Sequence, residues 1–257
     1  MRALWLSAGA MVTVLALLGT SSVLWGAFAY ARPPIETTSR SIPFKLSRLK
    51  VIVARGNVNV SIHPGEAGEL FLERSLRWSK QKPGVKEDWD EQRTLRLDVS
   101  CPGMDQPDAP LCQAHYTLFV PEETDIETES ANGGLDVHDI FGDIRMTSES
   151  GELRAYRTSG TVWARSGSGD VTGVGLTGGE ADMETGAGRV DLSFDAAPTK
   201  VRAVVRTRGD VVVVVPDLGY DVTASAKRAD VNVKKDPTSP RKITIQSQNA
   251  LVMPCCE

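Results

Sequence analysis

A short alternation of apolar and polar residues returns about every ten residues from residue 133 onward, and most copies follow a glycine. Side chains two apart on a strand lie on the same face, so the pattern predicts short strands with one buried and one exposed face. Glycine suits the sharp turns between them because it adopts positive φ at no Cβ cost. The first inward position is apolar in all twelve copies, and the second in eleven, Gly173 being the exception. We therefore expect an all-β repeat protein.

Alternate strands sort into two series with steps of 18 to 21 residues. A unit of two strands and two turns, repeated about six times, is typical of a solenoid, so we expect a parallel β-solenoid, or β-helix-like domain, with two core ladders. An antiparallel β-sandwich has similar strand spacing and stays open as the alternative. The first expected ladder is Leu135, Leu153, Val171, Val190, Val211 and Val231, and the second is Ile144, Val162, Ala181, Val201, Val222 and Ile243.

The chain begins with an uncharged stretch that runs from residue 3 to residue 31. About 20 apolar residues cross a bilayer, so we expect one transmembrane helix over residues 8–30, which serves as a signal anchor after a short cytoplasmic stub at residues 1–7. A cleaved signal stays open because Ala29-Tyr30-Ala31 resembles a cleavage site, although a signal's apolar stretch is usually shorter. Long domains translocate largely regardless of loop charge, so we place the C-terminal domain on the extracytoplasmic side.

Four further segments follow from composition and pattern. Residues 31–45 are polar and proline-bearing, which predicts a linker. Residues 46–125 predict an N-terminal β region with charged and cysteine-containing excursions. The repeat array is expected over residues 126–248, and residues 249–257 are expected to form a C-terminal tail.

Cys101 and Cys112 flank a proline-rich loop between two strand-like runs. Their spacing lacks the C-x2-C pattern of zinc sites, and His115 is the only histidine nearby, so a structural disulfide in an oxidising compartment is favoured. Cys255 and Cys256 adjoin each other in the expected tail, and the sequence assigns them no role.

Composition and motifs predict neither catalysis nor nucleic-acid binding. The net charge is −4, and no basic stripe provides the phosphate neutralisation on which nucleic-acid binders depend. The three histidines fall in separate segments without ligand spacing, and no catalytic motif occurs, so we expect no enzyme, no cofactor and no metal. Repeated Gly-Asp pairs suggest calcium, but the aspartates do not recur at every turn, which favours turn capping.

Outward positions of the repeats provide the candidate contact residues. Within one ladder, Arg145 and Trp163 are expected to form a cation–π contact, and Asp182 and Arg202 an ion pair. Trp163 is either an exposed binding anchor or is covered by the charged segment 76–92. Val212 and Val214 make their strand apolar on both faces, which predicts that another segment or subunit covers it.

Two blocks of the sequence resemble a known family. The array GDIRMTSESGELRAYRTSGTVWARSGSGDV and the preceding LRLDVSCPG…CQAHYTLFVP resemble the bacterial "putative adhesin" family of β-strand-repeat domains of unknown function, over roughly residues 49–245. The resemblance implies a repetitive β-fold, often attached to the bacterial envelope by one membrane helix. Some relatives are associated with envelope-stress signalling, and the family provides no catalytic residues to carry over.

These observations predict a single-pass protein of the bacterial cell membrane whose extracytoplasmic β-repeats contact an envelope protein or glycan, in adhesion or envelope stress. The alternative is a scaffold that self-associates through exposed backbone at the ends of the stack. A polysaccharide-active enzyme is disfavoured because Asp136 and Asp191 are three coils apart, about 14 Å at the strand spacing, which is too far for a catalytic carboxylate pair.

Overall fold

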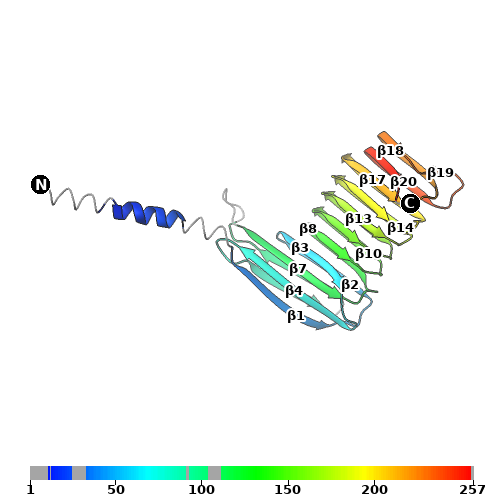
Figure 1. Ribbon diagram of the computed structural model, residues 1–257. Coiled ribbons are helices and arrows are strands. Elements are labelled where there is room, and N and C mark those ends of the chain that lie inside the picture. The colour runs from blue at the N-terminus through cyan, green and yellow to red at the C-terminus, as the bar shows by residue number, and fades with distance from the viewer. Residues whose placement is uncertain (1–10, 12, 25–32, 91–92, 104–110, 256–257) are drawn as a thin grey trace.

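The computed structural model describes residues 11, 13–24, 33–90, 93–103 and 111–255. The body of the molecule consists of two facing walls, each formed by strands that lie side by side along the length of the stack (Figure 1). The prediction of an all-β protein is confirmed, and most strand pairs are parallel. From residue 125 to residue 215, successive strands of the chain alternate between the walls, so the strands of this part that pair with one another come from consecutive coils.

In the first wall, called wall A, seven successive strands pair in parallel with one another. Its strands in spatial order are β6 (Thr94–Ser100), β2 (Arg48–Arg55), β8 (Asp125–Asn132), β10 (Ile144–Ser150), β12 (Val162–Ser168), β14 (Glu180–Ala187) and β16 (Lys200–Arg208).

The opposite wall, called wall B, is built in the same way from shorter strands. Its order is β7 (Cys112–Val120), β3 (Val58–Pro64), β9 (Leu135–His138), β11 (Leu153–Tyr156), β13 (Val171–Leu176), β15 (Val190–Phe194) and β17 (Asp210–Val215).

In-register pairing places equivalent side chains over one another along each wall. Leu153 pairs with Leu135 on one side and with Val171 on the other, and all three are buried. The inward side chains of both walls meet in one apolar core that extends from Ile42 to Val252. Burial of this apolar surface, at about 25 cal/mol per Å², is the main force that holds the walls together.

Antiparallel strands extend both walls at the N-terminal end. Wall B continues from β7 to β4 (Glu69–Trp78) and then to β1 (Ile35–Pro43), whereas wall A continues from β6 to β5 (Gly84–Asp90). Within the described residues these are the antiparallel pairs, so the pairing expected of an antiparallel sandwich is confined to this end.

The C-terminal end departs from sequence order. The last long strand, β20 (Lys242–Pro254), lies between β16 and β17 on one side and β18 (Gly219–Val231) on the other, and a short β19 (Lys234–Lys235) pairs with the start of β18. Both β18 and β20 pass through wall A and then wall B, so β18 is the outermost strand of both walls.

Because β20 lies between β18 and the strands β16 and β17, the expected order at the end of each core ladder is wrong. In wall A, Val201 pairs with Ile243, and Ile243 in turn pairs with Val222. In wall B, Val211 pairs with Ala250, so Val231 is not its neighbour and pairs with Val252 instead. The earlier ladder members follow the expected order.

The larger apolar side chains of β20 explain why it takes the inner position. Ile243 and Ile245 are buried on β20, whereas Val222 and Ala224 at equivalent places on β18 are only half-buried. Buried area contributes in proportion to apolar surface, so placing the isoleucines inside and the smaller residues at the end is favoured.

Three expected segment boundaries are wrong. The expected linker 31–45 contains β1, which pairs with β4 along its whole length. The expected boundary between residues 125 and 126 lies inside the stack, because β8 pairs with β2 from the first region and with β10 from the second. The expected tail 249–257 contains the end of β20, which pairs with β17 up to Pro254. Period-two alternation continues through the tail, in Ala250 and Val252, and could have indicated a strand.

Much of the N-terminal apolar segment lies outside the described residues. This holds for the expected stub 1–7 and, within the expected span 8–30, for residues 8–10, 12 and 25–30. Residues 13–24 are helical. Over the described part of the chain, no helix is both long and apolar enough to span a membrane.

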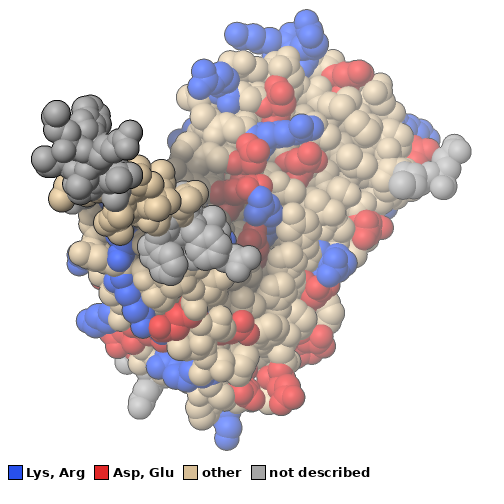
Figure 2. All heavy atoms as spheres, turned by 60° about the vertical axis from the view of Figure 1, so that its left-hand side comes forward, with Lys and Arg blue, Asp and Glu red and all other residues tan. Residues whose placement is uncertain are grey.

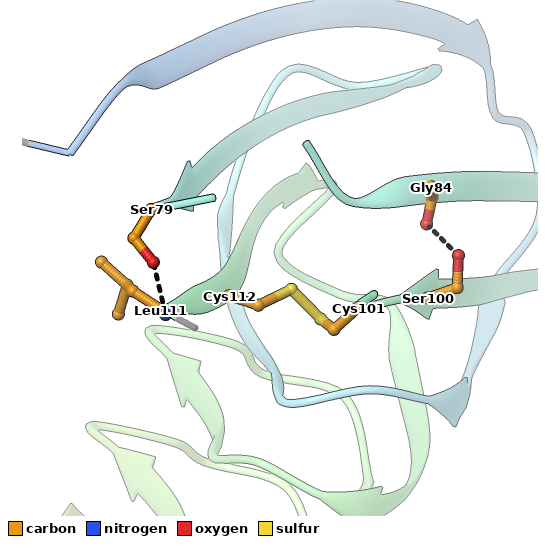
Figure 3. Close-up of a disulfide and its surroundings, with 6 residues drawn as sticks. All are labelled: Ser79, Gly84, Ser100, Cys101, Leu111 and Cys112. Atoms are coloured by element: carbon orange, nitrogen blue, oxygen red, sulfur yellow. Dashed lines mark hydrogen bonds between the residues drawn. A yellow bond between two sulfur atoms is a disulfide. The ribbon is translucent and has the colours of Figure 1, made fainter. Parts of the chain in front are cut away.

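The predicted disulfide between Cys101 and Cys112 is confirmed, with the two Cα atoms 5.9 Å apart. It joins the end of β6 in wall A to the start of β7 in wall B, across the outermost parallel coil (Figure 3). Beside it, the Leu111 amide donates a hydrogen bond to Ser79 Oγ, and Ser100 Oγ donates one to the Gly84 carbonyl. The disulfide therefore ties the two walls together, and the two hydrogen bonds connect it to the residue after β4 and to the start of β5.

Stacked glycines explain why this residue recurs at one corner of the coil. Gly169, Gly188 and Gly209 all have positive φ, between 127° and 143°. A Cβ on Gly209 would overlap the carbonyl oxygen of Gly188 in the coil below, and a Cβ on Gly188 would overlap that of Gly169. Both the backbone conformation and the close approach of successive coils therefore require glycine here.

We expect Gly209→Ala to lower the free energy of unfolding by about 3 kcal/mol, because it adds a backbone clash to an unfavourable φ. Gly68→Ala is the matched control, since Gly68 has φ +84° and nothing within 4 Å of an added Cβ. It should cost only about 1 kcal/mol. Urea denaturation of both variants measures the difference, and equal losses would show that close stacking does not select glycine at position 209.

Candidate functional site

The outer face of wall A brings together four of the predicted contact residues. Arg145, Trp163, Asp182 and Arg202 occupy one position on four adjacent strands and pair in that order. The Arg145 guanidinium carbon lies 3.6 Å from the centre of the Trp163 ring, which confirms the predicted cation–π contact. Arg202 Nη1 lies 3.0 Å from Asp182 Oδ1, which confirms the predicted ion pair.

Trp163 is half-buried on this face, and guanidinium groups rather than the charged segment lie against it. Arg165, one position along the same outer face, places its guanidinium carbon 4.4 Å from the Trp163 ring centre. The segment 84–90 forms β5, which pairs with β6, and three strands separate β6 from β12. The expectation that residues 76–92 cover Trp163 is therefore wrong for the described part of that segment.

A buried carboxylate fixes Arg165, one of the two arginines beside the ring. Glu184 is 4 % exposed and forms ion pairs with Arg165, Arg202 and Arg206. Burial would raise the pKa of Glu184, but the hydrogen bonds from Arg202 and Arg206 outweigh it and hold the pKa below its ordinary value. This set of residues is called the Trp163 cluster: Arg145, Trp163, Arg165, Asp182, Glu184, Arg202 and Arg206.

A shallow depression of about 300 Å³ adjoins the cluster on the side of Arg145. It extends from the start of β2 across β8 and β10 to β12, and Trp163 is one of the residues that line it. Both acidic and basic groups lie around it, among them Arg48, Asp125, Glu127, Asp143 and Arg145. Its chemistry therefore suits a ligand that offers hydrogen bonds and partial charges of both signs.

Val212 and Val214 lie on wall B, away from the Trp163 cluster. They are half-buried and pair with Leu251 and Met253 of β20, which form a small apolar area with them. The sequence predicted that another segment or subunit covers these valines, and β20 lies beside them in the wall. Over the described residues, no strand lies across this face.

Wall B also carries an aromatic row that sequence reasoning missed. The rings of His63 and His138 stack with their centres 4.6 Å apart, and His138 stacks on Tyr156 at 4.8 Å. Phe119 and Phe71 continue the row beyond His63, at 5.7 and 5.9 Å. These five residues, called the aromatic row, belong to five adjacent strands. No local spacing could have found them, because His63 and His138 are separated by 75 residues.

Acidic and basic pairs flank the aromatic row. Arg154 Nη1 lies 3.2 Å from Asp136 Oδ1 on one side, and Arg157 binds both carboxylate oxygens of Asp139 at 2.6 and 2.7 Å on the other. Burial lowers the pKa of His63 and of His138 below the ordinary value of 6.5, and His138 lowers the pKa of His63 further. Both imidazoles are therefore neutral at neutral pH.

These surfaces offer contact chemistry rather than converging reactive groups. In the described residues, no group of three or more His, Cys, Asp and Glu side chains is placed to hold a metal ion. Acidic and basic side chains are interspersed over much of the face in Figure 2. Each wall thus combines aromatic rings with charged pairs in a fixed register.

Comparison with known proteins gives limited similarity. No family model matches the chain, and no curated protein matches it. A structure from Clostridium sporogenes ATCC 15579, described as a "putative cell adhesion protein", covers 87 % of this chain and 99 % of its own at 15 % identity, with a TM-score of 0.37. A "putative adhesin" from Parabacteroides merdae ATCC 43184 covers 84 % of this chain and 96 % of its own at 10 % identity, with a TM-score of 0.22. At these TM-scores neither establishes a shared fold or activity.

We expect the free energy of unfolding to fall as the pH is lowered through about 6.5 toward 5.5. The folded state disfavours protonation of His63 and His138, so the unfolded chain binds more protons in this window, and stability is fully present only above it. His138→Phe retains a ring in the row and should weaken the pH dependence.

Urea denaturation between pH 7.5 and 5.5 measures the pH dependence of the free energy of unfolding at pH values above the ordinary pKa values of carboxylates. Tyr156→Phe is the matched control, because it changes the other ring that stacks on His138 without removing an imidazole, and it should retain the wild-type dependence. A His138→Phe variant as sensitive to pH as the wild type would contradict the assignment.

Proposed function

We propose that the chain is an extracytoplasmic contact protein of the bacterial cell membrane, in which a parallel β-solenoid presents its outer walls to a protein or glycan of the envelope. The Trp163 cluster carries this proposal. Trp and Arg are enriched among residues that dominate binding energy. The Trp163 ring lies against two guanidinium groups, of which Arg165 is fixed by Asp182 and Glu184, so the ring loses little conformational freedom on binding.

Two features support the proposed location. The Cys101–Cys112 disulfide is typical of proteins that fold in oxidising compartments. The uncharged stretch of residues 3–31 has the length of a membrane anchor and precedes the β domain directly. An anchor at this end would leave the rest of the stack free to face a partner.

A scaffold of copies stacked end to end is the second candidate, and one observation favours it. The outer edge of β18 has no strand partner over most of its length in the described part of the chain. Light scattering of the purified full chain tests this candidate, since stacking requires particles that grow with concentration.

Protease treatment of intact spheroplasts tests the location. We expect the β domain to be digested from outside while a cytoplasmic marker survives, because the proposed anchor leaves residues 33–257 on the outer side. The double variant Leu15→Arg/Leu18→Arg should abolish membrane attachment, since each charge is costly in hydrocarbon. Protection of the wild-type domain until lysis would refute the location.

Crosslinking in intact cells tests the contact surface. Trp163→Ala should reduce a crosslinked partner species by about tenfold or more, in line with the loss of a central aromatic contact. Thr244→Ala is the matched control, because Thr244 follows Arg202 in the same outward ladder and carries no ring. Partner yields that are equal in wild type and Trp163→Ala, with both variants folded, would refute the contact role of the cluster.

A further inference from the structure

The C-terminal end of the stack presents an unpaired strand edge. From Asp221 to Val231, β18 pairs with β20 on one side only. On the other side, the short β19 pairs only with Gly219 and Tyr220 in the described part of the chain. An edge of this length offers main-chain donors and acceptors that an added strand can pair with.

The apolar core is also thinly covered at this end. Val222, Ala224, Ala226 and Val231 on β18 are only half-buried, although they pack against the core. All four are smaller than the isoleucines Ile243 and Ile245 in the next strand inward. A strand added beside β18 would therefore gain apolar contacts together with main-chain hydrogen bonds.

The opposite end is closed in a different way. There, Arg74 of β4 and Glu87 of β5 meet between the walls at 2.6 Å, and both side chains are mostly buried. Tyr116 donates a hydrogen bond to the same carboxylate, and Arg40 lies 3.8 Å from it. Terminal repeats of solenoids need such polar caps. The N-terminal end also has strands, β1 and β5, that pair on one side only among the described residues, but charged side chains close the core there, whereas half-buried apolar side chains line the core beside β18.

Unpaired positive charge surrounds the open edge. Residues 219–242 have a net charge of +3, although the whole chain has −4. Figure 2 shows basic side chains gathered at the upper end, where β18 lies in Figure 1. Six basic residues lie in this segment, and none of them has an ion-pair partner among the described residues. They are Lys227, Arg228, Lys234, Lys235, Arg241 and Lys242. Arginines of the walls, such as Arg157 and Arg202, are paired.

We infer that the β18 edge binds an extended, acidic segment of another protein, which adds to the stack as a further strand. Main-chain pairing provides the affinity, and the unpaired lysines and arginines select negative charge. In wall A, three strands separate β18 from β12, which carries Trp163, so the site goes beyond the proposed contact surface and is tested separately from it.

A second copy of this chain fits the edge less well. Two β18 edges would bring like charges together, which is a recognised way to prevent edge-to-edge association. In a head-to-tail arrangement, the N-terminal end of a second copy would meet the β18 edge. At that end, wall B extends two strands beyond β7, to β1, whereas wall A extends only one strand beyond β6, to β5. This staggered end does not match the level edge that β18 forms across both walls.

Peptide binding to the purified full chain in detergent tests the inference. The probe is a labelled ten-residue peptide of alternating valine and glutamate, measured by fluorescence anisotropy. The controls are the same pattern with lysine in place of glutamate, and the acidic peptide with two central prolines, which cannot pair along a strand. We expect binding of the first peptide only.

Charge reversal locates the site. Lys227→Glu/Arg228→Glu should weaken acidic-peptide binding by about tenfold or more and create binding of the lysine peptide. Arg77→Glu/Lys86→Glu is the matched control, because it makes the same charge change at exposed positions on β4 and β5, at the far end of the stack. This control should leave binding unchanged.

Three outcomes would overturn the inference: equal binding of the proline peptide, equal loss in both charge-reversal variants, or a dimer that Lys227→Glu/Arg228→Glu disrupts. The last result would assign the edge to a second copy. The Trp163→Ala crosslinking result is scored separately, so failure of the strand-capture site can be distinguished from failure of the proposed contact function.

Discussion

Main-chain hydrogen bonding between parallel strands in exact register is the constraint on which the rest of the structure depends. It holds successive coils about 4.8 Å apart and places each side chain over its equivalent in the next coil. Because side chains alternate between faces, a slip of one residue would turn the core side chains of a strand to solvent. The same register that buries Leu153 between Leu135 and Val171 also sets Trp163 against Arg145 and the ring of His138 against that of Tyr156.

The sequence predicted the features that depend on this local period. Period-two alternation identified the inward positions of the middle coils, and equal spacing along a ladder led to the Arg145–Trp163 and Asp182–Arg202 contacts. The Cys101–Cys112 disulfide followed from two cysteines between strand-like runs. Each of these depends only on residues in the same coil or in adjacent coils of the chain.

What could not be predicted depends on which coils become neighbours out of order. The coil of β2 and β3 lies between the coil of β6 and β7 and that of β8 and β9, so His63 meets both Phe119 and His138. Likewise, β18 and β20 carry the same alternation, and only the larger side chains of β20 favour its inner place. The period-two alternation is the same whether β18 or β20 lies next to β16 and β17, so the pattern alone does not show which of the two is the inner strand.

The position of β20 also has a consequence for biosynthesis. A polypeptide emerges from the ribosome or a secretion channel from its N-terminus, so β18 is available well before the strand that separates it from β16 and β17. Until residues 242–254 arrive, the outermost coil has no neighbour with which to form its ladder. The terminal coils are therefore completed only when residues 242–254 have been made, and a product that ends before them would lack the strand that joins β18 to the stack.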